Sequence, residues 1–133
     1  MGERKEPRSN VSFEVYADKK WQKTGITVTE QEQAEVTYVS GSWNISPAVR
    51  NCDSDGNSSY IAKEGYTMPG KAEGGMIGRI GSSVFWIGKK GETPKGLKGE
   101  LELCANDDLD GRYGKGFTDN SGSIVVKIDL FLS

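Results

Sequence analysis

Two stretches near the C-terminus alternate between apolar and polar residues over most of their length. In Gly99–Ala105 one face carries Leu101 and Leu103, and in residues 123–132 the apolar side chains again occupy every second position. Successive side chains of a β-strand point to opposite faces, so a period of two predicts strands with one buried face. The same alternation predicts that Cys104 lies on the face opposite to Leu101 and Leu103.

Similar strand patterns recur upstream, with β-branched residues and turn signals between them. They cover residues 11–15, 24–29, 34–43, 75–81 and 84–88. The chain also has 18 glycines among 133 residues, and no segment has a convincing helical period. These features predict an all-β fold, a jelly-roll-like β-sandwich of short antiparallel strands. We expect residues 1–10 to form a flexible lead-in and residues 11–133 a single domain, with loop structure over most of 46–75, a length typical of functional loops.

Composition excludes several classes of function. A formal charge of -2 and a sequence pI of about 5.2 give no general attraction for phosphate backbones, so we do not expect nucleic acid as a partner. The chain has no histidine, which removes the usual general base and disfavours a zinc site. Two cysteines could form one disulfide but make no framework. No signal peptide or membrane-spanning run is visible, which predicts a cytoplasmic protein, one exported by a non-classical route, or a fragment.

The segment 106–122 is rich in carboxylates and carboxamides and joins the two alternating stretches. Its oxygen-bearing residues include Asp107, Asp108, Asp110, Asp119 and Asn120. Asp and Asn are ordinary turn formers, so a solvated hairpin is one interpretation. The other is a Ca²⁺ site, because this ion binds several oxygen ligands on flexible loops and would relieve repulsion between the carboxylates. The spacing is not that of an EF-hand.

Several motifs in order resemble the PA-I galactophilic lectin family, the LecA-like lectins. The strongest are Gly75-Met76-Ile77-Gly78-Arg79-Ile80-Gly81, Gly99-x-Leu101-x-Leu103-x-x-Asn106-Asp107, Tyr113-Gly114 and Asp119-Asn120-Ser121-Gly122-Ser123-x-x-Val126-x-Ile128; upstream, Trp21-x-x-Thr24-Gly25-Ile26-x-Val28 and Gly41-Ser42-Trp43 also resemble it. The resemblance extends over most of residues 11–130. It implies a galactose-binding-domain-like sandwich that binds one Ca²⁺, with two sugar hydroxyls completing the metal shell.

The resemblance also implies the metal ligands. Asp107 matches the residue that bridges metal and sugar, although Asp108 aligns equally well if the gap in the loop is moved. Asp119 and Asn120 match an adjacent Asn pair that supplies further side-chain ligands, and Asp119 is expected to reach the sugar as well. Main-chain carbonyls near Arg112 and Ser46 would fill the remaining positions.

The sugar contacts depart from the family pattern. The family uses a His and a Gln from the middle loop, whereas this chain carries Asp53-Ser54-Asp55-Gly56-Asn57 there. Asp55 or Asn57 could bond a sugar hydroxyl, and the sequence does not say which. Trp43 ends a strand beside the proposed metal loop and is a candidate for stacking on a sugar face. Trp86, inside an apolar strand, is predicted to be core.

The first functional hypothesis is therefore a non-enzymatic, calcium-dependent carbohydrate-binding protein or module for glycans with a galactose-type sugar. Family members assemble into oligomers, which implies a homo-oligomer and binding through several sites at once. A second hypothesis is a calcium-dependent membrane-surface module of the C2 type. A third is an enzyme, a small glycosidase with two carboxylates, or the sugar-targeting domain of a larger glycoside hydrolase.

Overall fold

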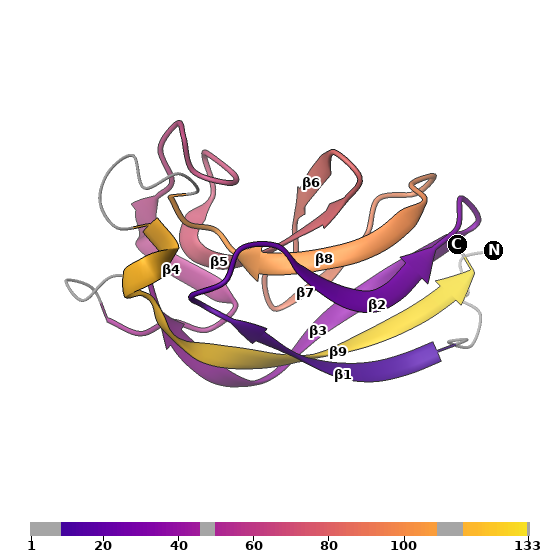
Figure 1. Cartoon of the computed structure of the whole chain (residues 1–133), viewed down its shortest axis with the longest axis horizontal. Helices are drawn as coiled ribbons and strands as arrows, with labels where there is room; N and C mark the ends of the chain where they lie inside the picture. The colour runs from indigo at the N-terminus through magenta and orange to yellow at the C-terminus, as the bar shows by residue number, and fades with distance from the viewer. Residues whose placement is uncertain (1–8, 46–49, 109–115, 133) are drawn as a thin grey trace.

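The structure is a computed structural model that describes residues 9–45, 50–108 and 116–132 (Figure 1). The described residues form nine strands and one 3-10 turn. In chain order these are β1 Ser9–Tyr16, β2 Gln22–Val28, β3 Glu32–Asn44, β4 Asp55–Ile61, β5 Ala72–Ile80, β6 Ser83–Trp86, β7 Lys90–Glu92, β8 Gly99–Ala105, η1 Gly116–Asp119 and β9 Ser121–Leu132. The predicted all-β class is confirmed, and the bounds of β8 agree with its alternating pattern.

The strands form two sheets that lie face to face as a sandwich (Figure 1). One sheet has the order β1-β9-β3-β7, and the other has the order β2-β8-β5-β4 with β6 also paired to β5. Every strand pair is antiparallel. Because β8 and β9 belong to opposite sheets, the acidic segment between them crosses from one layer to the other at one end of the sandwich.

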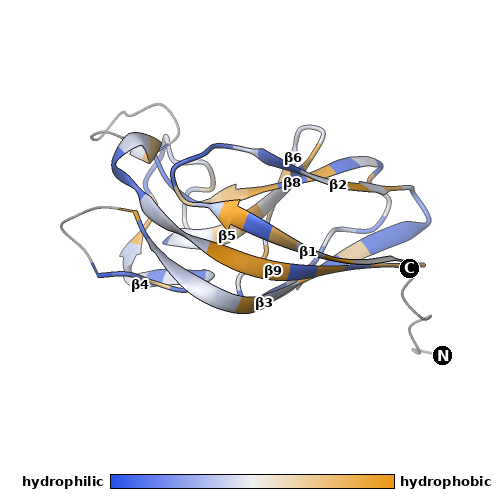
Figure 2. Cartoon of the chain, turned by 60° about the horizontal axis from the view of Figure 1, so that its bottom comes forward, coloured by the Kyte–Doolittle hydropathy of each residue, from blue (hydrophilic) through white to orange (hydrophobic). Residues whose placement is uncertain are grey.

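The main core lies between the sheets and is built from the alternating positions. Leu101 and Leu103 of β8 face Val126 and Ile128 of β9, and all four side chains are fully buried. Figure 2 shows the corresponding apolar bands along β8 and β9. Burying a side chain of this size contributes roughly 1.5–3 kcal/mol, so the period of two in the sequence accounts for the face-to-face packing.

A second apolar cluster lies on the outer face of the five-stranded sheet. It consists of Ile77, Cys104 and Phe117, with Trp21, Met68 and Trp86 packed against it. This confirms that Cys104 lies opposite to Leu101 and Leu103. η1 places Phe117 on this cluster, which anchors the second half of the acidic segment to β8. Both cysteines are free, so the disulfide does not form.

Two strands lie in segments that were predicted as connections, and that part of the prediction is wrong. β4 pairs only with β5 and is exposed over most of its length, so its residues carry no alternating signal. β7 has only three residues, which is too short for a pattern. β5 also begins at Ala72, inside the segment predicted as loop.

None of the helical turns in the described residues has the length and apolar content needed to span a bilayer.

Candidate functional site

The two described halves of the acidic segment meet at one end of the sandwich, where β8 ends and η1 leads into β9 (Figure 1). Four of the predicted metal ligands lie here: Asp107, Asp108, Asp119 and Asn120. The carbonyls predicted near Arg112 and Ser46, and the side chain of Asp110, lie outside the described residues.

Asn120 joins the two halves of the segment. Its Nδ2 donates to Asp107 Oδ2 at 2.6 Å and to the carbonyl of Ala17 at 2.8 Å. The other carboxylate oxygen, Asp107 Oδ1, accepts from the main-chain N–H of Asp108 at 2.7 Å. Both partners of the Asn120 amide are acceptors, which fixes its nitrogen toward them and its oxygen away. The structure thus brings the side chains of Asp107 and Asn120 together.

The Oδ1 atom of Asn120 is buried and accepts no hydrogen bond within the described part of the chain. A buried polar atom without a partner costs roughly 1–3 kcal/mol. Such an orphaned oxygen, fixed in place by the two bonds of its own amide nitrogen, is suited to a ligand that accepts lone pairs, such as a hard cation.

The charge of Asp107 is also poorly accommodated. The side chain is buried, with 4% exposure, and this burial raises its pKa from 3.8 to about 6. The bonds from Asn120 and Asp108 lower the pKa, whereas the negative charges of Asp119 and Asp108 raise it. The site therefore holds a carboxylate in a setting that disfavours its charge and that a nearby cation would stabilise.

Asn106 positions the start of the acidic segment. Its fully buried carboxamide accepts from the N–H of Met68 at 2.8 Å and donates to the carbonyls of Met68 at 2.9 Å and Ala72 at 3.2 Å. The next carbonyl, that of Asp107, accepts from the N–H and the hydroxyl of Thr67, both at 3.0 Å. These bonds hold Asp107 against the connection between β4 and β5.

Sequence reasoning missed two further residues beside the acidic segment. Tyr66 pairs with Asp108 through a main-chain bridge, and its side chain hydrogen-bonds the carboxylate of Glu73. Burial raises the pKa of both Tyr66 and Glu73, and the charge of Asp108 adds to each shift. Both residues come from a segment that was predicted as loop, and no local motif identified them.

Carboxylates alone do not complete a metal site here. Within residues 9–45, 50–108 and 116–132, no three Asp, Glu or Cys side chains are grouped closely enough to hold an ion. Any cation bound at this end would therefore need the Asn120 oxygen and main-chain carbonyls as well, which is a common donor set for Ca²⁺.

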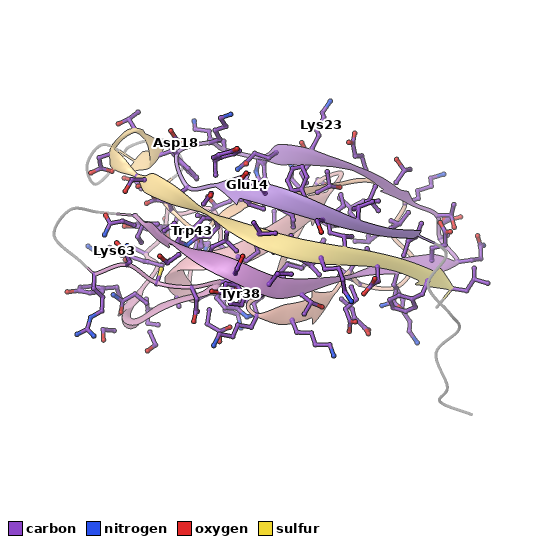
Figure 3. All side chains as sticks on the ribbon, turned by 90° about the horizontal axis from the view of Figure 1, so that it is seen from below. Glu14, Asp18, Lys23, Tyr38, Trp43 and Lys63 are labelled. Atoms are coloured by element: carbon purple, nitrogen blue, oxygen red, sulfur yellow. The ribbon has the colours of Figure 1, made fainter. Side chains whose placement is uncertain are left out.

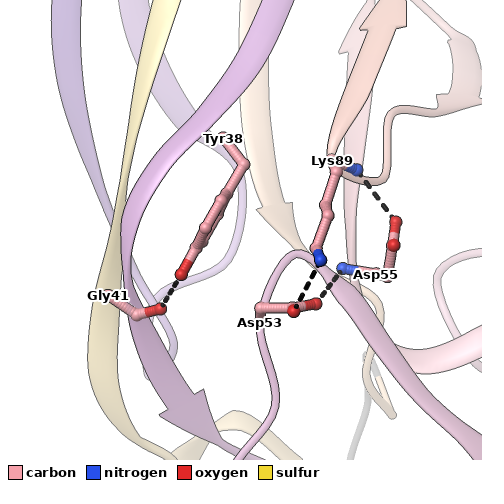
Figure 4. Close-up of polar contacts among 5 residues, drawn as sticks. All are labelled: Tyr38, Gly41, Asp53, Asp55 and Lys89. Atoms are coloured by element: carbon pink, nitrogen blue, oxygen red, sulfur yellow. Dashed lines mark hydrogen bonds and ion pairs between the residues drawn. The ribbon is translucent and has the colours of Figure 1, made fainter.

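Asp55 and Asn57 lie on edge strand β4, on the other side of β5 from β8. Asp55 Oδ1 accepts from the N–H of Lys89, and the Asp55 N–H donates to Asp53 Oδ1, both at 2.9 Å (Figure 4). Asn57 Oδ1 accepts from the N–H of Ser59 at 3.1 Å. Within the described residues, these hydrogen bonds do not connect either side chain to the acidic segment.

Trp43 does not fit the predicted role of a sugar-stacking residue. Trp43 is labelled in Figure 3. Its side chain is fully buried, and its indole N–H donates to the carbonyl of Gly74 at 2.7 Å. The physical reason is a β-bulge between Tyr38 and Ser40. The bulge shifts the alternation, so Trp43 shares the inner face with Val36 although seven positions separate them. Trp86, predicted as core, is half-buried on the outer cluster.

Comparison with known proteins identifies a related fold. A solved structure described as the EclA N-terminal domain, a PllA-like lectin, superposes with a TM-score of 0.62 and 20% sequence identity. The match covers 92% of this chain and 95% of that chain. No protein-family profile and no curated protein sequence matches this chain. At this level of identity the likeness establishes architecture, and the chain therefore has a lectin-like β-sandwich fold.

Proposed function

We propose that this chain is a non-enzymatic, calcium-dependent carbohydrate-binding protein or module related to the PA-I galactophilic lectins. The observation that carries the proposal is Asn120, whose nitrogen binds Asp107 while its buried oxygen has no donor in the described residues. The lectin-like fold supports the same function, since the solved neighbour is described as a lectin.

The residues present fit a calcium ion. Asp107, with either Asp108 or Asp119, would supply carboxylate oxygens, Asn120 would supply its free Oδ1, and main-chain carbonyls would supply the remaining donors. These are hard oxygen donors, and an ion beside Asp107 would offset the penalty that raises its pKa to about 6. When bound, calcium would offer coordination positions to two vicinal hydroxyls of a galactose-type sugar.

The protein residues would hold the donors in place for this chemistry. The bonds of Asn106 and Thr67 fix Asp107 on one side. On the other side Asp107 accepts from Asn120, which is itself bonded to Ala17. A site whose donors are already ordered loses less entropy on binding. Affinity per site would be modest, and a homo-oligomer would strengthen binding through several sites at once.

The test is a glycan array read with calcium and again with chelator, together with melting curves under both conditions. We expect binding to galactose-type glycans only with calcium, and a higher melting temperature with calcium. Asp107→Ala should abolish both effects, whereas Glu30→Gln, an exposed charge change, should leave them intact. A calcium titration with no heat and no change in melting temperature would show that the mechanism is wrong.

A C2-like membrane module is the second candidate, and one observation favours it. Glu73, from a separate segment, lies close enough to Asp108 for that charge to affect its pKa, and C2 domains likewise gather acidic residues from separate loops. Co-sedimentation with anionic vesicles in calcium separates the two functions. Calcium-dependent pelleting without glycan binding would favour the membrane module over the lectin.

A further inference from the structure

A polar hollow lies at edge strand β4 and is lined by residues 50–53 and 56–59. Its volume is about 390 Å³, within the roughly 300–1,000 Å³ of small-molecule sites. It lies at the same end of the sandwich as the acidic segment. The main chain of its residue Cys52 bonds that of Trp43, and Trp43 also pairs with Gly122, two residues after Asn120.

Arg50 gives this hollow a positive charge that no carboxylate of residues 9–45, 50–108 or 116–132 pairs with. Arg50 is one of the residues that line the hollow, and its side chain has no ion pair or hydrogen bond among the described residues. The carboxylate in the lining, Asp53, is already engaged, because Asp53 Oδ2 lies 3.3 Å from Lys89 Nζ and Asp53 Oδ1 accepts from the N–H of Asp55 (Figure 4). Asp53 is therefore paired with Lys89, whereas Arg50 has no carboxylate partner in the described part of the chain.

The neutral side chains of the hollow add hydrogen-bonding capacity. The oxygen of Asn57 is occupied by the N–H of Ser59, which leaves its amide nitrogen as a donor. Asn51 and Ser58 also line the hollow, and both residues are exposed. One guanidinium surrounded by amide and hydroxyl groups can bind an anion together with the ring hydroxyls of a saccharide.

We propose that this hollow binds an anionic sugar, with Arg50 donating to a carboxylate or sulfate group on the pyranose. The inference rests on the proposed function and deepens it, because it names the class of sugar that the chain prefers. A chain of net charge -2 repels anions in general, so recognition of an acidic sugar depends on a local cation such as Arg50.

The test uses the full chain in calcium and a matched pair of probes, methyl galactoside and methyl galacturonide, which differ by a carboxylate at C6. Galactose 6-sulfate tests whether a sulfate group is bound as well as a carboxylate. Acetate tests whether a carboxylate is bound without a sugar ring. We expect the galacturonide to bind more tightly than the neutral galactoside. Arg50→Gln should weaken the galacturonide about tenfold or more, the effect of losing one charged hydrogen bond, and leave the galactoside unchanged.

Two further variants control for charge and geometry. Lys98→Gln removes an exposed positive charge outside the hollow and should change neither affinity. Arg50→Lys keeps the charge but not the planar fork, so it should retain part of the preference for the galacturonide. Melting curves check that each variant is folded, which is expected because Arg50 is exposed.

The outcomes separate this inference from the proposed function. Equal loss of both sugars in Arg50→Gln, no loss of either, or acetate competing as well as the galacturonide would overturn the inference. If the neutral galactoside still binds in calcium, the proposed function stands in each of those cases. Galacturonide binding without calcium would support the inference that the hollow binds an anionic sugar, and it would refute the calcium mechanism. No binding of any probe sugar would refute both.

Discussion

The raised pKa of Asp107 predicts an unusual pH dependence of stability in the metal-free chain. Burial shifts this pKa from 3.8 to about 6, and two units correspond to about 3 kcal/mol. The folded chain therefore holds the proton more tightly than the unfolded chain does. The stabilisation is complete below pH 3.8 and is lost as the pH rises through about 6.

Asp107→Asn isolates this effect. Asparagine keeps an oxygen that can accept from the Asn120 amide, and it carries no charge at any pH. Chelator-treated wild type and variant would be unfolded in urea across a pH series. Between about pH 5 and about pH 7.5, the free energy of unfolding of wild type should fall by about 1.5 kcal/mol relative to that of the variant. The fall is not the full 3 kcal/mol, because about half of that stabilisation is already lost at pH 5. Taking the difference between the two free energies of unfolding cancels the pH-dependent contributions of carboxylates that both proteins share, such as that of Glu73.

Two results would contradict this reasoning. One is a stability difference that does not change with pH, and the other is wild type gaining stability over Asp107→Asn as the pH rises. The control Glu30→Gln, which removes an exposed carboxylate, should show no trend of this size. If the site binds calcium, added calcium should stabilise wild type more at the higher pH, because metal binding requires the deprotonated carboxylate.

Three further predictions concern packing and thiol chemistry. Gly75→Ala should destabilise the fold by about 1–3 kcal/mol in urea unfolding, because the new Cβ would lie 2.1 Å from the Trp86 ring. Asn106→Ala should cost about 2–4 kcal/mol by the same assay, because it leaves several buried main-chain groups unpaired, whereas exposed Asn51→Ala should cost little. Burial raises the pKa of the Cys104 thiol, so mass spectrometry after alkylation should find it modified only in denaturant.

The alternation of apolar residues was sufficient to predict the sandwich. In β8 and in residues 124–128 of β9 the two-residue period holds, so one buried face can be identified locally. Towards the end of β9 the predicted alternation is wrong, because Phe131 is buried and Leu132 is exposed. The alternation was also sufficient to place Cys104 on the outer face, as observed. By contrast, β4 and β7 contribute little buried surface, and their pairing depends on neighbouring strands rather than on their own residues.

The candidate site was predictable only in part. Asp107 and Asn120 lie in one connection, so their proximity follows from a single hairpin-like crossing. Tyr66 joins the same site from 42 positions before Asp108, through a bridge that no local pattern encodes. The environment of Trp43 was misjudged for a different reason, since a single extra residue in the bulge of β3 reverses which face the tryptophan occupies.

The burial of Trp43 gives the protein an intrinsic optical reporter. Its indole is screened from solvent, whereas Trp21 and Trp86 are half-buried on the outer face. Acrylamide should therefore quench the emission of those two first and leave a blue-shifted component from Trp43. The main chain of Trp43 pairs with both Cys52 and Gly122. The residual Trp43 emission should therefore report structural changes at this end of the sandwich without any added label.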